Sequence, residues 1–153
     1  MFKFLSHLIN INAGLAQKAK ADMLYAEATA YYQAKEYTKA APLMSEASEL
    51  GNPQAMAVLG TMYLFGHGVS ENGPAALRCL QAAIDAGYEE AQSTLGMALA
   101  TGKAGIKIDL PRAIEILTPC AANGDEQAAQ MLSMIEKGEG MFRWAKRAGR
   151  RTK

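Results

Sequence analysis

The 153-residue chain contains only two cysteines and no uninterrupted apolar run near the roughly 20 residues that cross a membrane. A structural zinc site or a dense disulfide framework needs more cysteines, at closer spacing, than Cys79 and Cys120 provide. A secretory signal is also not expected, because His7 and Asn10 interrupt the apolar residues near the N-terminus. We therefore expect a protein of a reducing compartment, located in the cytoplasm.

Acidic residues are absent from residues 141–153, although sixteen bases and fifteen acids make the whole chain nearly neutral at +1. Six of the bases lie in this segment, so residues 1–140 hold ten bases against fifteen acids, a net charge of −5. A basic segment of this kind can contact an acidic partner, nucleic acid or anionic lipid, and the simpler interpretation is a solvated tail. Its bases are Arg143, Lys146, Arg147, Arg150, Arg151 and Lys153, with Trp144 among them.

A repeat of small and apolar residues runs through the middle of the chain. Gly51, Ala55, Leu59, Gly60 and Gly66 return 36 positions later as Gly87, Ala91, Leu95, Gly96 and Gly102, and a partial third copy has Gly124, Ala128 and Leu132. Offsets of three and four residues are helical, so each repeat predicts two antiparallel helices with one apolar face each. The first glycine of each copy is expected to end a helix, and Asn72 and Asp109 are expected to cap one.

The segment LGTMYLFGHGVSENGPAALRCLQAAIDAG, residues 59–87, resembles a Sel-one-like repeat (SLR). The likeness is carried by Leu59, Gly60, Tyr63, Gly66, Gly68, Val69, Asn72, Ala76, Ala82, Ala83 and Gly87. The second copy is weaker, since Leu99 replaces the tyrosine, and the N-terminal unit is similar to a tetratricopeptide repeat through Ala28, Tyr31, Tyr37, Ala40, Met44 and Ala47. The resemblance implies an all-α fold, a right-handed superhelical solenoid of stacked antiparallel helix pairs.

This pattern predicts three parts in the chain. Residues 1–20 form a flanking helix, whose apolar residues favour packing onto the first repeat over a membrane or dimer contact. Residues 21–138 form the solenoid, with units at about 21–51, 52–87 and 88–124 and a capping helix at 125–137, and residues 139–153 form the basic tail. The helices are expected near 3–19, 21–34, 37–50, 53–65, 73–86, 88–101, 109–122 and 125–137.

The residues available for catalysis or metal binding are few. Cys79 and Cys120 occupy recurring positions on helix faces, where free cysteine packs as a small hydrophobe. His67 lies in a loop between two glycines, and this loop joins two helices without the strand and lysine of a nucleotide site. We therefore expect no enzymatic activity, no metal and no cofactor, and a hydrolase built on the repeats is a minor alternative.

A binding surface is then the main candidate for function. In superhelical repeats the first helix of each pair lines the concave side. Spacing from the recurring glycines places these residues in the groove: Tyr25, Thr29, Tyr32, Gln33, Gln54, Ala57, Thr61, Leu64, Phe65, Glu90, Ser93, Met97, Thr101, Gln127, Gln130 and Met134. This mostly uncharged, aromatic set suits an amphipathic helix or an extended peptide. The alternative is that Leu64, Phe65, Met97 and Met134 pack between helices.

The favoured hypothesis is a non-enzymatic, bacterial-type module that binds one protein or peptide partner as an adaptor, chaperone or regulator. Similar small repeat proteins include immunity proteins that neutralise toxins, which the resemblance adds as a further role. The competing hypothesis is binding of nucleic acid or an anionic membrane surface through the basic tail. The oligomeric state is open, because a short solenoid has two exposed ends.

Overall fold

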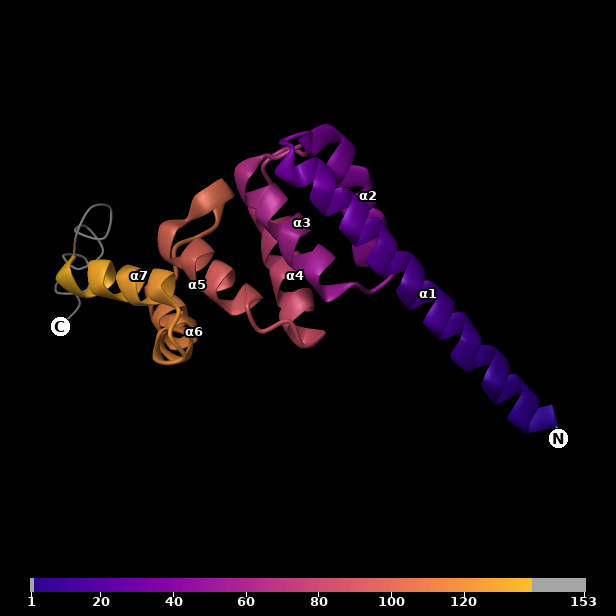
Figure 1. Cartoon of the computed structure of the whole chain (residues 1–153). Coiled ribbons are helices and arrows are strands. Elements are labelled where there is room, and N and C mark those ends of the chain that lie inside the picture. Colours follow the sequence, from indigo (N-terminus) through magenta and orange to yellow (C-terminus); the bar gives the residue numbers. More distant parts are fainter. Residues whose placement is uncertain (1, 139–153) are drawn as a thin grey trace. The chain divides into compact units, whose positions relative to one another are not determined.

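The computed structural model describes residues 2–138, with side chains from residue 11 onward, and this part of the chain is all helical. The helices are α1 (Phe2–Gln33), α2 (Tyr37–Glu49), α3 (Pro53–Phe65), α4 (Gly73–Asp85), α5 (Ala91–Thr101), α6 (Leu110–Ala122) and α7 (Glu126–Lys137), with a short 3-10 helix, η1 (Lys103–Gly105) (Figure 1). The predicted all-α class is confirmed. Within the described residues no helix combines the length and apolar character needed to cross a bilayer.

The chain divides into two compact units after Tyr88. In the first unit α1 packs against α2, α2 against α3 and α3 against α4, and in the second unit α6 packs against both α5 and α7. Alanines at the recurring positions are fully buried: Ala40, Ala47, Ala76, Ala83 and Ala113. The largest fully buried side chains are Met44, Met62, Leu80 and Leu117. Small residues at the repeat positions thus bring the helices together, and larger apolar side chains fill the space between them.

The recurring glycine of each helix pair allows a close approach of its two helices. A Cβ on Gly60 would lie 2.9 Å from Cγ of Leu80, and a Cβ on Gly96 would lie 2.6 Å from Cγ of Leu117. Both distances are below what real Cβ atoms show, so a larger residue would force the leucine of the facing helix to shift. The repeat pattern in the sequence therefore encodes the packing of each pair.

The helix ends follow the predicted signals. The side chains of Asn72 and Asp109 accept hydrogen bonds from the backbone amides of Ala75 and Arg112, at 2.9 and 3.1 Å, and so cap α4 and α6. The glycines that end α2, α4 and α6, at positions 51, 87 and 124, all have φ between 91° and 94°. Both predictions are confirmed, because capping depends on residues next to each other in the chain.

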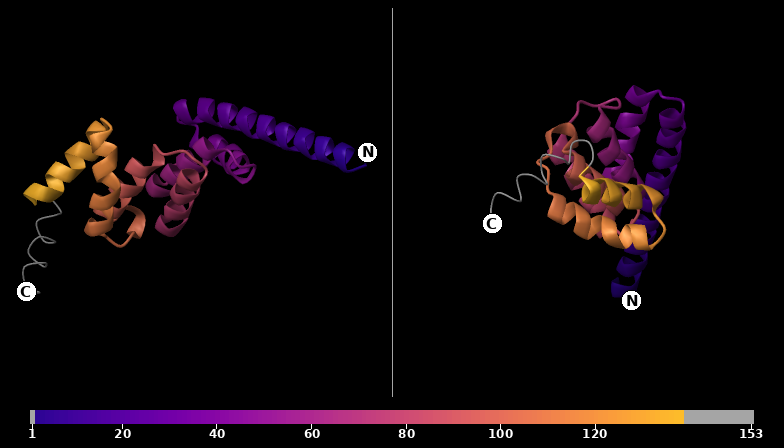
Figure 2. Two further views of the ribbon diagram at one scale, coloured as in Figure 1. Left: turned by 90° about the horizontal axis from the view of Figure 1, so that it is seen from below. Right: turned by 90° about the vertical axis from the view of Figure 1, so that its left-hand side faces the viewer.

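The N-terminal helix differs from the prediction of two helices near 3–19 and 21–34. Residues 2–33 form one continuous helix, because the sequence around residue 20 is rich in alanine and lysine and contains neither glycine nor proline. Residues 11–20 are all exposed, and the N-terminal half of α1 extends past α2 (Figure 2). Two of these residues nevertheless contact the first repeat: Gln17 donates to the carbonyl of Leu50 at 3.5 Å, and Lys20 pairs with Glu46 at 2.7 Å. The packing of the apolar side chains before residue 11 stays a prediction, because they lie outside the described side chains.

The first helix of the third predicted unit also begins later than expected, at Ala91 rather than near residue 88. A tight turn precedes it, in which the amide of Gln92 donates to the carbonyl of Glu89 at 2.9 Å. Glu90 occupies the N-cap position without a capping side-chain hydrogen bond. In the second unit, α6 and α7 thus begin at a capping aspartate, whereas α5 begins without a capping side chain.

Candidate functional site

Four aromatic rings gather in the first unit, where the end of α1, the start of α2 and the loop after α3 meet. We call Tyr32, Tyr37, Phe65 and His67 the ring cluster. The turn between α1 and α2 brings the two tyrosines together, and it is closed by a hydrogen bond from the amide of Glu36 to the carbonyl of Tyr31 at 2.9 Å. Two residues that the groove prediction singled out, Tyr32 and Phe65, therefore lie in one cluster.

His67 is the centre of the ring cluster. Its ring stacks on Tyr37 with centroids 4.2 Å apart and an interplanar angle of 5°, and it lies 5.7 Å from the ring of Phe65. The Tyr32 hydroxyl is hydrogen-bonded to Nδ1 of His67 at 3.1 Å, and the Tyr32 ring meets Tyr37 edge-on at 5.1 Å. Each ring thus has at least one aromatic neighbour that fixes its orientation.

Gly68 holds the loop against α2. A Cβ at this position would lie 2.1 Å from the carbonyl oxygen of Tyr37, and the residue has a φ of 70°. Only glycine meets both conditions without strain. The close contact of loop and helix brings His67 over the ring of Tyr37.

The Tyr32 hydroxyl of the ring cluster is uncharged at neutral pH. Burial raises the pKa of Tyr32, and the neighbouring Tyr37 raises it further. The Tyr32 hydroxyl therefore keeps its proton at neutral pH. Phe65 is 51% exposed, so a large apolar ring faces solvent beside this fixed set of neighbours.

The other predicted groove positions of the first unit fall into two groups. Leu64 is 3% exposed and Ala57 is also buried, so these two side chains pack in the core and do not reach the surface. Thr29 and Thr61 are half-buried and donate to carbonyls of their own helices, at 2.7 and 3.1 Å. Tyr25 and Gln54 are half-buried and Gln33 is exposed.

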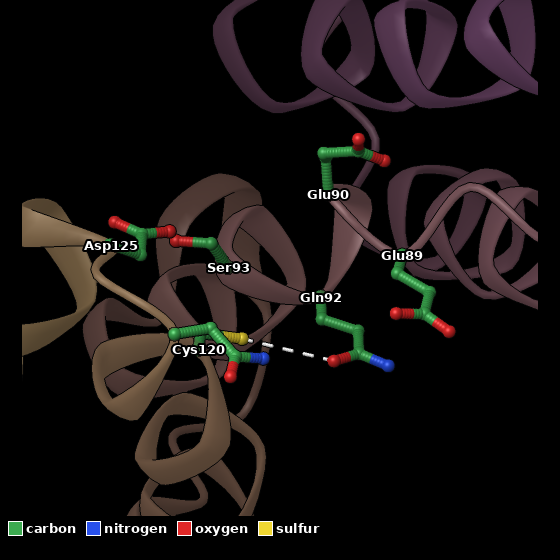
Figure 3. A pocket seen from close by; sticks show the side chains of 7 residues that line it. Glu89, Glu90, Gln92, Ser93, Cys120 and Asp125 are labelled. Carbon is green, nitrogen blue, oxygen red and sulfur yellow. Dashed lines mark hydrogen bonds between the residues drawn. The ribbon is translucent and has the colours of Figure 1, made fainter.

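In the second unit, Glu90 and Ser93 line a pocket of about 290 Å³ (Figure 3). Met97 is half-buried, and its carbonyl accepts the hydroxyl of Thr101 at 2.8 Å. The three predicted positions on α7 are exposed: Gln127, Gln130 and Met134. In this unit, the predicted groove residues therefore lie in two places: on the lining of the pocket and on the exposed face of α7.

Two members of the ring cluster were not predicted as site residues. Tyr37 begins the second helix of its pair, and the spacing rule selects only first helices. For His67, its place between two glycines predicts a turn and not a site. The sequence does show that aromatic residues are frequent in the first unit. It does not show that the turn after α1 and the loop after α3 bring Tyr37 and His67 together. The predicted basic-tail residues, Arg143, Trp144, Lys146, Arg147, Arg150 and Arg151, lie outside the described residues.

The cysteines behave as packing residues. Cys79 is half-buried against the core of the first unit, and burial raises the pKa of its thiol. Cys120 donates to the carbonyl of Ile116 at 3.3 Å, and burial raises its pKa as well. Both thiols are therefore protonated at neutral pH. Among the described residues no group of histidine, cysteine and acidic side chains is arranged to hold a metal ion.

The repeat units match a known family. Residues 53–88 and 89–125 match the model of the Sel1 repeat. The chain carries two Sel1 repeats. Proteins with these repeats generally mediate protein–protein interactions and are generally non-enzymatic. The first match spans α3 and α4, and the second spans α5 and α6.

Solved structures of Sel1 repeat proteins share the fold. A protective antigen of uropathogenic Escherichia coli that displays an SLR fold aligns with a TM-score of 0.68 and 24% identity, over 80% of this chain and 27% of that one. A Sel1 repeat protein of Oxalobacter formigenes aligns with a TM-score of 0.63 and 25% identity, over 74% and 47%. The Helicobacter pylori cysteine-rich protein B aligns with a TM-score of 0.50 and 22% identity, over 61% and 69%. The chain thus spans less than half the length of the first two structures, and the solenoid class is confirmed.

Proposed function

We propose that this chain is a non-enzymatic module that binds a protein or peptide partner, as an adaptor, a chaperone, a regulator or a toxin-neutralising immunity protein. The observation that supports this proposal is the ring cluster, in which Phe65 is 51% exposed beside rings that hold one another in place. Exposed aromatic side chains are enriched in protein interfaces and contribute much of the binding energy there. The general role of Sel1 repeats in protein–protein interactions supports the same conclusion.

The fixed geometry of the cluster favours binding over simple exposure. A partner that contacts the cluster does not need to order His67, because this ring is already stacked on Tyr37 and bonded to Tyr32. Association then loses less side-chain entropy than it would with mobile side chains. A preformed aromatic surface therefore supplies affinity at a low entropic cost.

The chemistry of the cluster also separates this proposal from binding through the basic tail. None of the four ring-cluster residues is an acid, a lysine or an arginine, so binding to the cluster should depend weakly on ionic strength. Binding of nucleic acid or anionic lipid through the tail should instead weaken steeply as salt is added. Salt dependence thus distinguishes the two surfaces.

The experiment is affinity capture from a native lysate of the source organism on the immobilised full chain, followed by titration with the purified captured protein. Phe65→Ala should weaken binding at least about tenfold at both low and moderate salt, as expected for a central aromatic contact. Ile114→Ala is the matched control, since this apolar side chain on α6 is 41% exposed and is not a predicted groove position. It should leave the affinity unchanged.

Two results would overturn the proposal. One is capture of nucleic acid or lipid alone, at low salt alone, with loss of capture when glutamines replace the arginines of the tail. The other is a captured protein whose affinity is the same for Phe65→Ala and for the unsubstituted chain.

A further inference from the structure

The first half of α1 carries apolar residues that the first unit does not cover. Residues 11–20 are all exposed, and this part of the helix extends past α2 (Figure 2). Leu15 and Met23, at 62% and 74%, are the most exposed large apolar side chains of the described residues, and Ile11 is 45% exposed. Apolar side chains that gather on one exposed surface mark a site of interaction.

The sequence of this segment divides into an apolar side and a polar side when it is wound as a helix. At about 100° per residue, the six large apolar residues between positions 4 and 15 lie within about 160° of the helix circumference. Lys3, His7, Asn10 and Lys18 lie on the remaining side. The residues of the apolar side are Phe4, Leu5, Leu8, Ile9, Ile11 and Leu15.

The apolar side lies opposite the side of α1 that faces the rest of the first unit. That other side is marked by Gln17, which donates to the carbonyl of Leu50 at 3.5 Å, and by Ala21 and Ala28, which are 1% and 0% exposed. Helical spacing places these three positions about 180° from the centre of the apolar side. The first unit therefore packs on one side of the helix and leaves the apolar side to another partner.

The charges of the segment indicate the chemistry of that partner. Residues 1–21 contain no aspartate or glutamate, and their charged residues are Lys3, Lys18 and Lys20. Lys20 pairs with Glu46 at 2.7 Å, whereas Lys18 is exposed at the edge of the apolar side, three positions after Leu15. The segment thus combines an apolar side with positive charge that no acid of its own balances.

A second copy of the helix fits this pattern poorly. Two such helices would bring lysines together without an acid between them, and like charges on paired helices are destabilising. The apolar side is also wider than the narrow stripe through which two helices pair. A lipid surface with negative headgroups satisfies both features, because it attracts the lysines and accepts a broad apolar side.

We propose that residues 2–20 bind the surface of an anionic lipid bilayer. The helix lies in the plane of the headgroups, with its apolar side toward the acyl chains and its lysines toward the lipid phosphates. The apolar side provides most of the affinity, and the lysines provide selectivity for negative lipids. The ring cluster includes Tyr32 at the opposite end of α1, so the membrane contact and the proposed binding of a protein partner can each fail alone.

The test is flotation of the full-length chain with two kinds of vesicle, one of phosphatidylcholine and phosphatidylglycerol in equal parts and one of phosphatidylcholine alone. Because the tail is also basic, every chain in the test carries Arg143→Gln, Arg147→Gln, Arg150→Gln and Arg151→Gln. This background should bind the anionic vesicles, and it should bind the neutral vesicles at least about fivefold more weakly. A background chain that does not float with the anionic vesicles would overturn the proposal.

Substitutions on α1 then separate its two sides. Leu15→Gln should weaken binding to the anionic vesicles at least about tenfold, because its side chain no longer enters the apolar phase. Ala13→Gln is the matched control, since Ala13 is exposed and lies outside the apolar side, and it should leave the binding unchanged. Lys18→Gln should weaken binding about fivefold at low salt and less at high salt. Equal binding by Leu15→Gln and Ala13→Gln would refute the proposed contact.

The remaining outcomes are distinguished by controls without lipid or outside α1. Leu15→Gln should keep the helical circular dichroism of the background, because Leu15 is 62% exposed, so its loss of binding does not reflect unfolding. Phe65→Ala should float as the background does. A chain that is a dimer without lipid and becomes a monomer on Leu15→Gln, measured by sedimentation equilibrium, would show that a second copy covers the apolar side and would overturn the assignment to lipid.

Discussion

The substitution Gly68→Ala tests whether the ring cluster is held by the contact between its loop and α2. The new methyl group would lie 2.1 Å from the carbonyl oxygen of Tyr37 and 2.4 Å from its carbonyl carbon. These are backbone atoms at the start of a helix, so no side chain can rotate away to relieve the overlap. The loop must move, and the stacking of His67 on Tyr37 must change with it.

The size of the effect follows from two contributions. A non-glycine residue in the left-handed region costs about 1–2 kcal/mol, and forcing extra atoms into a packed contact costs about 1–3 kcal/mol. We therefore expect Gly68→Ala to lower the free energy of unfolding by roughly 2–5 kcal/mol. Gly51→Ala is the matched control in the same unit, because Gly51 also has a positive φ but no atom lies within 4 Å of its added Cβ. It should lose only the backbone contribution of about 1–2 kcal/mol.

The assay is urea unfolding of the full-length variants, followed by circular dichroism at a helical wavelength. Gly68→Ala should have a lower urea midpoint than Gly51→Ala by an amount that corresponds to at least about 1 kcal/mol. It should also weaken binding of the partner as Phe65→Ala does. Equal stabilities of the two glycine variants would refute the argument that the loop is fixed against α2.

Three further predictions concern other parts of the molecule. Asp125→Ala should lower the free energy of unfolding by about 1 kcal/mol because the cap of α7 is lost, and Asp125→Asn should retain most of the stability. The pKa of this carboxyl is lowered on folding. The stability that the charged carboxyl contributes should therefore be present above the ordinary carboxyl pKa, and it should be lost as the pH falls through the lowered value. Leu15→Ala, at a position 62% exposed on α1, should change the unfolding free energy by less than about 0.5 kcal/mol, whereas Met44→Ala in the core should cost about 2–5 kcal/mol in the same urea assay. Cys79 should react with iodoacetamide more slowly in the folded chain than in urea, and because burial raises the pKa of its thiol, the stabilising contribution of the protonated form should be lost as the pH rises above the ordinary thiol pKa.

The helix pairs could be predicted because their signals are local or periodic. The recurring Gly60 and Gly96 face a leucine of the second helix of each pair, and Asn72 and Asp109 cap the helices that follow them. These features depend on residues a few positions apart, and the 36-residue period repeats the same arrangement. A periodic sequence thus contains enough information for the packing within a pair.

The ring cluster could not be predicted in the same way, because it is made by residues from three separate elements. Tyr32 and His67 are 35 positions apart, and they meet only because the turn after α1 and the loop after α3 lie side by side. The continuous α1 was missed for a related reason. The predicted boundary near residue 20 rests on the start of the repeat pattern, although the sequence there has no helix-breaking residue.

The two Sel1 repeats show where recognition can differ while the packing stays the same. The loop after α3 and the loop after α5 both begin with a left-handed glycine, at φ 68° and 69°. The positions of Phe65 and His67 correspond, 36 residues later, to Thr101 and Lys103. The second loop is one residue longer and contains η1, but it also joins two packed helices and has no aromatic side chain at these two positions. The rings are therefore not required for a repeat of this kind to form. An aromatic set that is partly exposed in the first unit, and that has no counterpart in the second, supports the proposal that the ring cluster is a contact surface.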